Sequence, residues 1–326
     1  MWRWRRSLPL HPEEHNMNIK PRILLVDDEE RILRSLGLLL RMQYQVFATS
    51  DGYEALEILK REKIHVLISD QRMPIMTGSE LLRHARDIAP DTIRILLTGY
   101  ADADAALESV NEGEIFRYIT KPWGPKELRD TVAQAAEIGV RLECADARPA
   151  VPVVQAADRL VCMVLDRDES TWQAVQEALG ARHEVIWRQS VQGALQVLAT
   201  KSVAIMVTEL SLGDEDLSAM IKTLKQERPE MLTVILTCFK DTSRLVDLIN
   251  QAQVFRYLPK PVRKGLLNKS LESTIARYLS ITASPLQLTT QVVEKTRDEA
   301  EQQVSEKISG YLARLRGKTI FAGSTA

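Results

Sequence analysis

Polar side chains that can hold a cation or a phosphate group follow short apolar runs in the first half of the chain. They are Asp27, Asp28, Asp70, Thr98 and Lys121. Carboxylates that lie close together repel one another unless a cation joins them, and oxygen ligands of this kind suit Mg²⁺. A lysine and a hydroxyl supply charge and a donor for phosphoryl oxygens. If the fold brings these residues together, they predict a Mg²⁺ site in which an aspartate can accept a phosphoryl group.

The apolar pattern around these residues predicts an alternating α/β fold. Short continuous apolar runs predict buried strands at 23–26, 46–48, 66–68, 93–97 and 115–119. Apolar residues at helical spacing predict helices at 32–40, 55–59, 81–85, 106–110 and 126–142. Five such pairs predict a parallel sheet with helices on both faces, and the polar residues then share one edge, at the carboxyl ends of the strands.

The same pattern returns at a constant offset of 139 residues. Matched positions include Ala55 and Ala194, Pro90 and Pro229, Thr98 and Thr237, Asn111 and Asn250, Phe116-Arg117-Tyr118 and Phe255-Arg256-Tyr257, and Lys121-Pro122 and Lys260-Pro261. One offset held through five predicted strands indicates a tandem duplication without net insertion. The chain is therefore expected to contain two doubly wound five-stranded domains.

Residues 22–142 resemble the receiver domain of two-component response regulators. The motifs that carry the resemblance are Asp27-Asp28, Asp70, the Met73-Pro74 pair after it, Thr98, Tyr118 and Lys121-Pro122. The resemblance implies a flavodoxin-like (CheY-like) fold and a phosphoryl group transferred to Asp70 from a sensor histidine kinase.

The resemblance also implies a role for each residue of the site. Asp28 would bind Mg²⁺ directly and Asp27 largely through water. Asp70 would be the third carboxylate, with the backbone carbonyl of Arg72 beside it. Capping of the next helix is an alternative role for one of Asp27 and Asp28, because both precede a predicted helix.

Three further residues complete the implied switch. Lys121 would pair with the phosphoryl oxygens, and Thr98 would hydrogen-bond to them. The movement of Thr98 would let Tyr118 rotate inward, which is the output of the domain.

The second copy departs from the pattern at its ligand positions. The matching residues are Asp166, Arg167, Glu209, Thr237, Tyr257 and Lys260. Arg167 stands where Asp28 stood and opposes Mg²⁺ by charge repulsion, and its guanidinium could pair with Glu209. The copy thus resembles a degenerate pseudo-receiver that is not phosphorylated. An alternative alignment, with Asp168 as the second acid, needs a local shift.

Composition limits the class of protein. The 326 residues carry a net charge of −1, which disfavours a protein whose main ligand is the phosphate backbone of a nucleic acid. No apolar run approaches ~18 residues, which predicts no membrane span. The three cysteines form no CxxC pair, which argues against a disulfide framework or zinc ribbon and favours the cytoplasm.

The expected domains are a disordered segment 1–20, a phosphorylatable receiver 21–143, a linker 144–157, a pseudo-receiver 158–283 and a helical tail 284–326. Met17 is a candidate start, because the folded pattern begins just after it. A helix is predicted over 289–316, and the 4-3-4 spacing of Val304, Ile308, Tyr311 and Leu315 suits a coiled-coil seam. Homodimerisation and docking on the second domain both remain open for this helix.

No enzyme motif accompanies the two copies, so output through contact with a downstream protein, not identified by the sequence, is expected. No DNA-binding domain is evident. A haloacid-dehalogenase-like phosphatase is the alternative enzyme, but Arg72 stands where such enzymes need a second aspartate. An RNA-binding antiterminator is the other alternative, and one helix of mixed charge is too little for its three-helix module.

Overall fold

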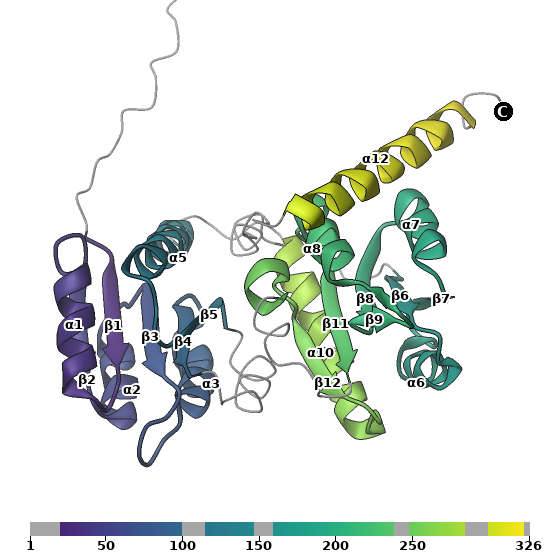
Figure 1. The fold of residues 1–326 in the computed structure, drawn as a ribbon. Coiled ribbons are helices and arrows are strands. Elements are labelled where there is room, and N and C mark those ends of the chain that lie inside the picture. The colour runs from purple at the N-terminus through teal and green to yellow at the C-terminus, as the bar shows by residue number, and fades with distance from the viewer. Residues whose placement is uncertain (1–19, 100–114, 147–158, 238–247, 284–298, 323–326) are drawn as a thin grey trace, which may run out of the picture.

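The computed structural model describes residues 20–99, 115–146, 159–237, 248–283 and 299–322, which form two α/β units and a C-terminal helix (Figure 1). The strands of the first unit are β1 (Arg22–Val26), β2 (Gln45–Thr49), β3 (Val66–Asp70), β4 (Ile93–Thr98) and β5 (Arg117–Thr120). They form one parallel sheet in the order β2-β1-β3-β4-β5. Its helices are α1 (Glu30–Leu40), α2 (Gly52–Arg61), α3 (Gly78–Ile88) and α5 (Pro125–Asp146).

The second unit repeats this arrangement. Its parallel strands are β6 (Val161–Leu165), β7 (Glu184–Arg188), β8 (Val203–Thr208), β11 (Leu232–Thr237) and β12 (Arg256–Pro259), in the order β7-β6-β8-β11-β12. Its helices are α6 (Glu169–Leu179), α7 (Val191–Thr200), α8 (Ser218–Glu227) and α10 (Lys264–Ala283). The prediction of an α/β chain with two five-stranded parallel sheets is therefore confirmed.

One element of the second unit was not predicted. A short antiparallel pair, β9 (Ser211–Leu212) and β10 (Glu215–Asp216), lies between β8 and α8. Gly213 makes the turn with a φ of 72°, a conformation that glycine adopts without steric cost. Leu212 is buried, so the hairpin is anchored to the core of its unit.

Burial of the strands on both faces holds the carboxyl ends of the sheet in place. All residues of β3 and β4 are buried, as is most of β1. Each fully buried aliphatic side chain contributes about 1.5–3 kcal/mol relative to exposure. Helix α3 begins with a capping box in which Thr77 and Glu80 satisfy each other's backbone N–H groups. The loops that follow the strands thus start from a rigid frame.

The C-terminal helix α12 (Glu299–Ala322) packs on α7 and α8 of the second unit. Ile308 and Leu312 are buried in that contact, and Lys222 Nζ lies 2.7 Å from Glu301 Oε1. Of the predicted 4-3-4 residues, Ile308 and Tyr311 pack in this contact and Leu315 is half-buried, whereas Val304 is 41% exposed. The helix also runs past its predicted end at 316.

Several expectations lie outside the described residues. They are the segment 1–19, the helix at 106–110, most of the linker, the start of the tail and its last four residues. Among the helices of the described ranges, none combines the length and the apolar character that crossing a bilayer requires.

Candidate functional site

Three carboxylates meet where β1 and β3 end. Asp27, Asp28 and Asp70 each offer an oxygen, and these oxygens lie within 4.8 Å of one another. The two strands are neighbours, with Val26 opposite Ser69, so the residues that follow them share one edge of the sheet. Asp27 is 1% exposed and Asp70 is 6% exposed, whereas Asp28 is open to solvent. The fold thus brings together the three aspartates that the sequence singled out.

Lys121 closes the cluster from the end of β5. Its Nζ lies 2.6 Å from Asp70 Oδ1 and 3.0 Å from Asp27 Oδ2. Burial by itself would lower the pKa of Lys121, but hydrogen bonds to Asp70 and Asp27 outweigh it and raise that pKa above its ordinary value. Burial raises the pKa of Asp27, despite hydrogen bonds from Glu29 and Lys121. The lysine is held charged between two acceptors.

Backbone donors fix two of the carboxylates. The N–H of Glu29 donates to Asp27 Oδ1 at 2.9 Å, and the N–H of Arg72 donates to Asp70 Oδ2 at 2.9 Å. The predicted role of the Arg72 carbonyl stays a prediction. Glu29 is the N-cap of α1, with no side-chain cap. Among the described residues, Asp28 has no hydrogen-bond partner, so it does not serve as the helix cap.

The donor set fits Mg²⁺. Three hard oxygen ligands converge, two of them are oriented by backbone N–H groups, and the third, Asp28, is exposed to solvent. Asp28 also lines a cleft of about 160 Å³ with Ser50, Tyr53, Pro74 and Met76. Asp27, Asp28 and Asp70 would therefore hold the ion, and Asp28 is the one of the three that faces the cleft.

The two predicted switch residues are both buried. The Thr98 hydroxyl donates to the Gly99 carbonyl at 3.2 Å, and the Tyr118 side chain is 2% exposed. The backbone of Tyr118 instead contacts Asn250 of the second unit through two hydrogen bonds. In the sequence, Asn250 is distinguished only as the match of Asn111, which gives no indication of this contact.

The second unit builds a similar edge without the third carboxylate. The Asp168 N–H donates to Asp166 Oδ1 at 2.8 Å, and Lys260 Nζ lies 2.8 Å from Asp166 Oδ2. Lys260 also pairs with Glu209. Hydrogen bonds to Asp166 and Glu209 overcome burial and raise the pKa of Lys260. Lys260 N–H donates to the Thr237 carbonyl, as Lys121 N–H does to that of Thr98.

The expected pair between Arg167 and Glu209 is not formed. The Glu209 carboxylate is bonded to Lys260, whose ammonium already lies between Glu209 and Asp166. The Arg167 guanidinium instead lies against Gly213, where a Cβ atom would collide with it. Among the described residues, no metal-like cluster other than Asp27, Asp28 and Asp70 was found.

Asp168 and Tyr257 of the second copy have roles in the fold of their unit. The Asp168 side chain caps α6 by accepting the Ser170 N–H at 2.9 Å. Hydrogen bonds from Ser170 lower the pKa of Asp168. Tyr257 is 1% exposed, and burial raises its pKa well above the ordinary value. The alternative alignment with Asp168 as a second acid therefore gains no support from its geometry.

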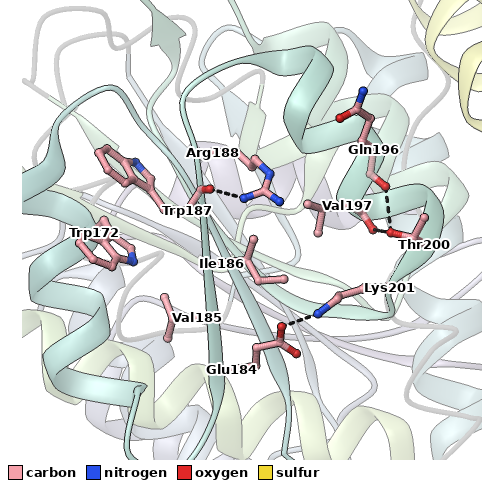
Figure 2. A pocket seen from close by; sticks show the side chains of 10 residues that line it. All are labelled: Trp172, Glu184, Val185, Ile186, Trp187, Arg188, Gln196, Val197, Thr200 and Lys201. Carbon is pink, nitrogen blue, oxygen red and sulfur yellow. Dashed lines mark hydrogen bonds and ion pairs between the residues drawn. The ribbon is translucent and has the colours of Figure 1, made fainter.

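A larger hollow of about 530 Å³ lies on the second unit (Figure 2). It runs along the edge strand β7, beside the stacked rings of Trp172 and Trp187, whose centroids are 5.3 Å apart. Its charged groups are engaged locally, because Lys201 pairs with Glu184 and Arg188 donates to the Trp187 carbonyl. The hollow offers no converging polar groups comparable to the carboxylate cluster.

Comparisons with known proteins point to the first unit. The profile of the family described as "Response regulator receiver domain" matches residues 23–133. "Hydrogenase transcriptional regulatory protein HoxA" of Cupriavidus necator is 42% identical over 115 residues, which are 35% of this chain and 24% of that protein. The protein of that name from Bradyrhizobium diazoefficiens is 36% identical over 122 residues, which are 37% of this chain and 25% of that protein.

A solved structure is also similar. The signal receiver domain of an HD domain-containing protein from Pseudomonas fluorescens Pf-5 is 38% identical, with 38% of this chain and 92% of that chain covered and a TM-score of 0.37. The chain spans about a quarter of the length of the two curated relatives above.

Proposed function

Residues 23–133 are a response regulator receiver domain, and from this premise we propose that the chain is a response regulator of a two-component phosphorelay with Asp70 as its phosphoacceptor. The observation that carries the proposal is the cluster of Asp27, Asp28 and Asp70 with Lys121 Nζ 2.6 Å from Asp70 Oδ1. Like-charged carboxylates held this closely need a cation, and a lysine beside them suits phosphoryl oxygens.

The transfer exchanges one bond to phosphorus for another. An Asp70 carboxylate oxygen attacks the phosphorus of a phosphohistidine on a sensor histidine kinase. A P–O bond forms, the P–N bond breaks, and its electron pair stays on the imidazole of the kinase. Lys121 moves from Asp70 to the new phosphoryl oxygens. Mg²⁺, when bound, supplies positive charge that neutralises the carboxylates and the phosphoryl oxygens.

The output begins at Thr98. Its hydroxyl now bonds to the Gly99 carbonyl, so it is free to exchange that local acceptor for a phosphoryl oxygen. The movement biases Tyr118 on the neighbouring strand β5, whose register places it opposite Leu96. A local change of charge thereby shifts a two-state element.

We further propose that the second unit is a pseudo-receiver that does not accept a phosphoryl group. Its sheet has the strand order of the first, which supports a duplicated fold. Arg167 replaces a ligand, and Glu209 is bonded to Lys260. The positive charge of Arg167, at the position of the missing ligand, opposes a divalent cation.

Output through protein contact, not catalysis, is part of the same proposal, with the cytoplasm as its location. The second unit and α12 would supply contact surfaces for a downstream protein or a second copy of the chain. If the chain is instead a phosphatase, it should release phosphate from p-nitrophenyl phosphate over many turnovers. A receiver should not.

The test of the phosphoacceptor is mass spectrometry of the full chain after incubation with acetyl phosphate and Mg²⁺. The wild type should gain about 80 daltons, the mass of one phosphoryl group. Asp70→Asn should abolish the gain, whereas the matched change in the second unit, Glu209→Gln, should leave it intact. A gain that survives Asp70→Asn, or no gain in the wild type, contradicts the proposal.

A further inference from the structure

The outer edge of β5 is occupied by the second unit. The Tyr118 N–H donates to Asn250 Oδ1 at 2.8 Å, and Asn250 Nδ2 donates to the Tyr118 carbonyl at 2.9 Å. Strand β5 is the last in its sheet, so both backbone groups face away from β4. The Asn250 carboxamide therefore bonds both outward-facing backbone groups of Tyr118, as a neighbouring strand would. We call this pair of hydrogen bonds the Asn250 clamp.

The contact is dry. Tyr118 and Tyr257 are both buried in one continuous cluster of apolar side chains that spans the two units. Leu248, Ile249 and Ala252, which flank Asn250 in a helical segment, belong to the same cluster. Burial is the main cause of the raised pKa of Tyr257, and Tyr118 is the second, so the two phenol groups lie near each other. Asn250 itself is half-buried, so its two hydrogen bonds to Tyr118 lie at the border of this cluster.

Strand β5, which the Asn250 clamp holds, is followed by the lysine that contacts the phosphoacceptor Asp70. Lys121 lies three residues after Tyr118, its N–H donates to the Thr98 carbonyl at 2.8 Å, and its Nζ lies 2.6 Å from Asp70 Oδ1. A phosphoryl group on Asp70 has to enter the space beside that oxygen, so the lysine must withdraw. Because β5 is held by β4 on one side and by Asn250 on the other, the docked unit resists this adjustment.

We propose that the second unit is the resident partner of the β5 edge, and that its docking through Asn250 and the phosphorylation of Asp70 oppose each other. The inference rests on the proposed function of Asp70. Coupling between two sites is reciprocal: a phosphoryl group loosens the Asn250 clamp, and a broken clamp eases phosphorylation. The second copy thus acts as an intramolecular restraint on the first.

The first experiment follows amide hydrogen exchange at Tyr118 in the full chain, with and without acetyl phosphate and Mg²⁺, while mass spectrometry counts the phosphoform. Faster exchange at Tyr118 in the phosphoform supports the inference. A full mass gain with unchanged exchange overturns the inference and leaves the proposed function standing. No mass gain removes the proposed function, and the coupling with it.

The second experiment breaks the clamp. Asn250→Ala should speed phosphorylation by acetyl phosphate roughly fivefold, whereas Asn268→Ala, an equivalent change on α10, should not. Asn250→Asp is a second variant of the same size, which keeps the acceptor for the Tyr118 N–H but sets an oxygen against the Tyr118 carbonyl. It should act in the same direction. Wild-type rates in whichever of these two variants folds would overturn the inference.

Discussion

At the scale of single residues, Asp28 is the ligand whose contribution can be isolated, because it is exposed and, among the described residues, has no hydrogen-bond partner. Mg²⁺ that binds only the folded chain raises its stability, by about 2.7 kcal/mol at a hundredfold excess over Kd. We expect Mg²⁺ to raise the thermal midpoint of the wild type and to lose most of this effect in Asp28→Asn. Differential scanning calorimetry over a Mg²⁺ series measures it.

The matched control is Asp168→Asn, which follows Asp166 in the second unit as Glu29 follows Asp27. Asparagine keeps the cap of α6, so the fold should be retained. This variant should respond to Mg²⁺ as the wild type does. A response lost in Asp168→Asn but retained in Asp28→Asn would place the ion in the other unit.

The site could be predicted from residues whose positions follow from topology. Asp27, Asp28 and Asp70 end buried parallel strands, so their meeting follows from strand order alone. The pairing of Arg167 with Glu209 was wrong, because it depends on competition with Lys260 for the same carboxylate. Such competition between side chains is decided by ångström-scale geometry, which spacing in the sequence does not specify.

At the scale of elements, helix α8 carries an amine in its buried face. Burial lowers the pKa of Lys225 to about 7, and its Nζ donates to the Pro229 and Met231 carbonyls. Between pH 7 and the ordinary value of 10.5, the unfolded chain holds a proton that the folded chain has released. Unfolding then takes up a proton, so the free energy of unfolding rises with pH across this window.

The prediction is that Lys225→Met removes this rise. From pH 7 to pH 9 the wild type should gain stability relative to the variant, by roughly 1 kcal/mol per pH unit. Urea unfolding at the two pH values measures the difference. An identical pH dependence in both proteins would show that Lys225 keeps its proton on folding.

The docking of α12 gives a second prediction for an element. Leu312 is fully buried, whereas Val304 on the same helix is 41% exposed. Leu312→Ala should lower the free energy of unfolding by about 2–5 kcal/mol through a lost side chain and a residual cavity. Val304→Ala should change it by less than about 0.5 kcal/mol. If both variants unfold at the wild-type urea concentration, α12 does not rest on the second unit in solution.

Helices and strands could be predicted where the apolar residues follow a single spacing along the sequence. Continuous apolar runs located the strands, since a strand buried on both faces has no polar position. The β9–β10 hairpin was missed because its strands have two residues each, which is too short for any period. The apolar face of α12 was predicted in part: Ile308 and Tyr311 of the coiled-coil spacing are in the docked face, but Leu312 is buried there too and Val304 is exposed.

At the scale of the whole molecule, the repeat predicted two similar sheets but not how they meet. The contact depends on one carboxamide, Asn250, that reaches the backbone of Tyr118. A polar residue on a helix is ordinarily solvated, so its type carries no signal of an interface. Because Tyr118 and Tyr257 are buried in one apolar cluster that both units share, we expect the stability of each unit to depend on the other.

The final prediction uses the second unit as a reporter of events in the first. The stacked Trp172 and Trp187, 5.3 Å apart with an interplanar angle of 9°, should give an exciton signal in circular dichroism that is lost when the second unit unfolds. Because the interface links the two units, Mg²⁺ bound at Asp28 should raise the midpoint of this signal, by about 2–4 °C for each kcal/mol transmitted. In Asn250→Ala the effect should shrink, since the linkage is weakened. A wild-type midpoint that ignores Mg²⁺, while calorimetry shows the ion bound, would mean that the two units unfold independently and that the interface transmits no stability.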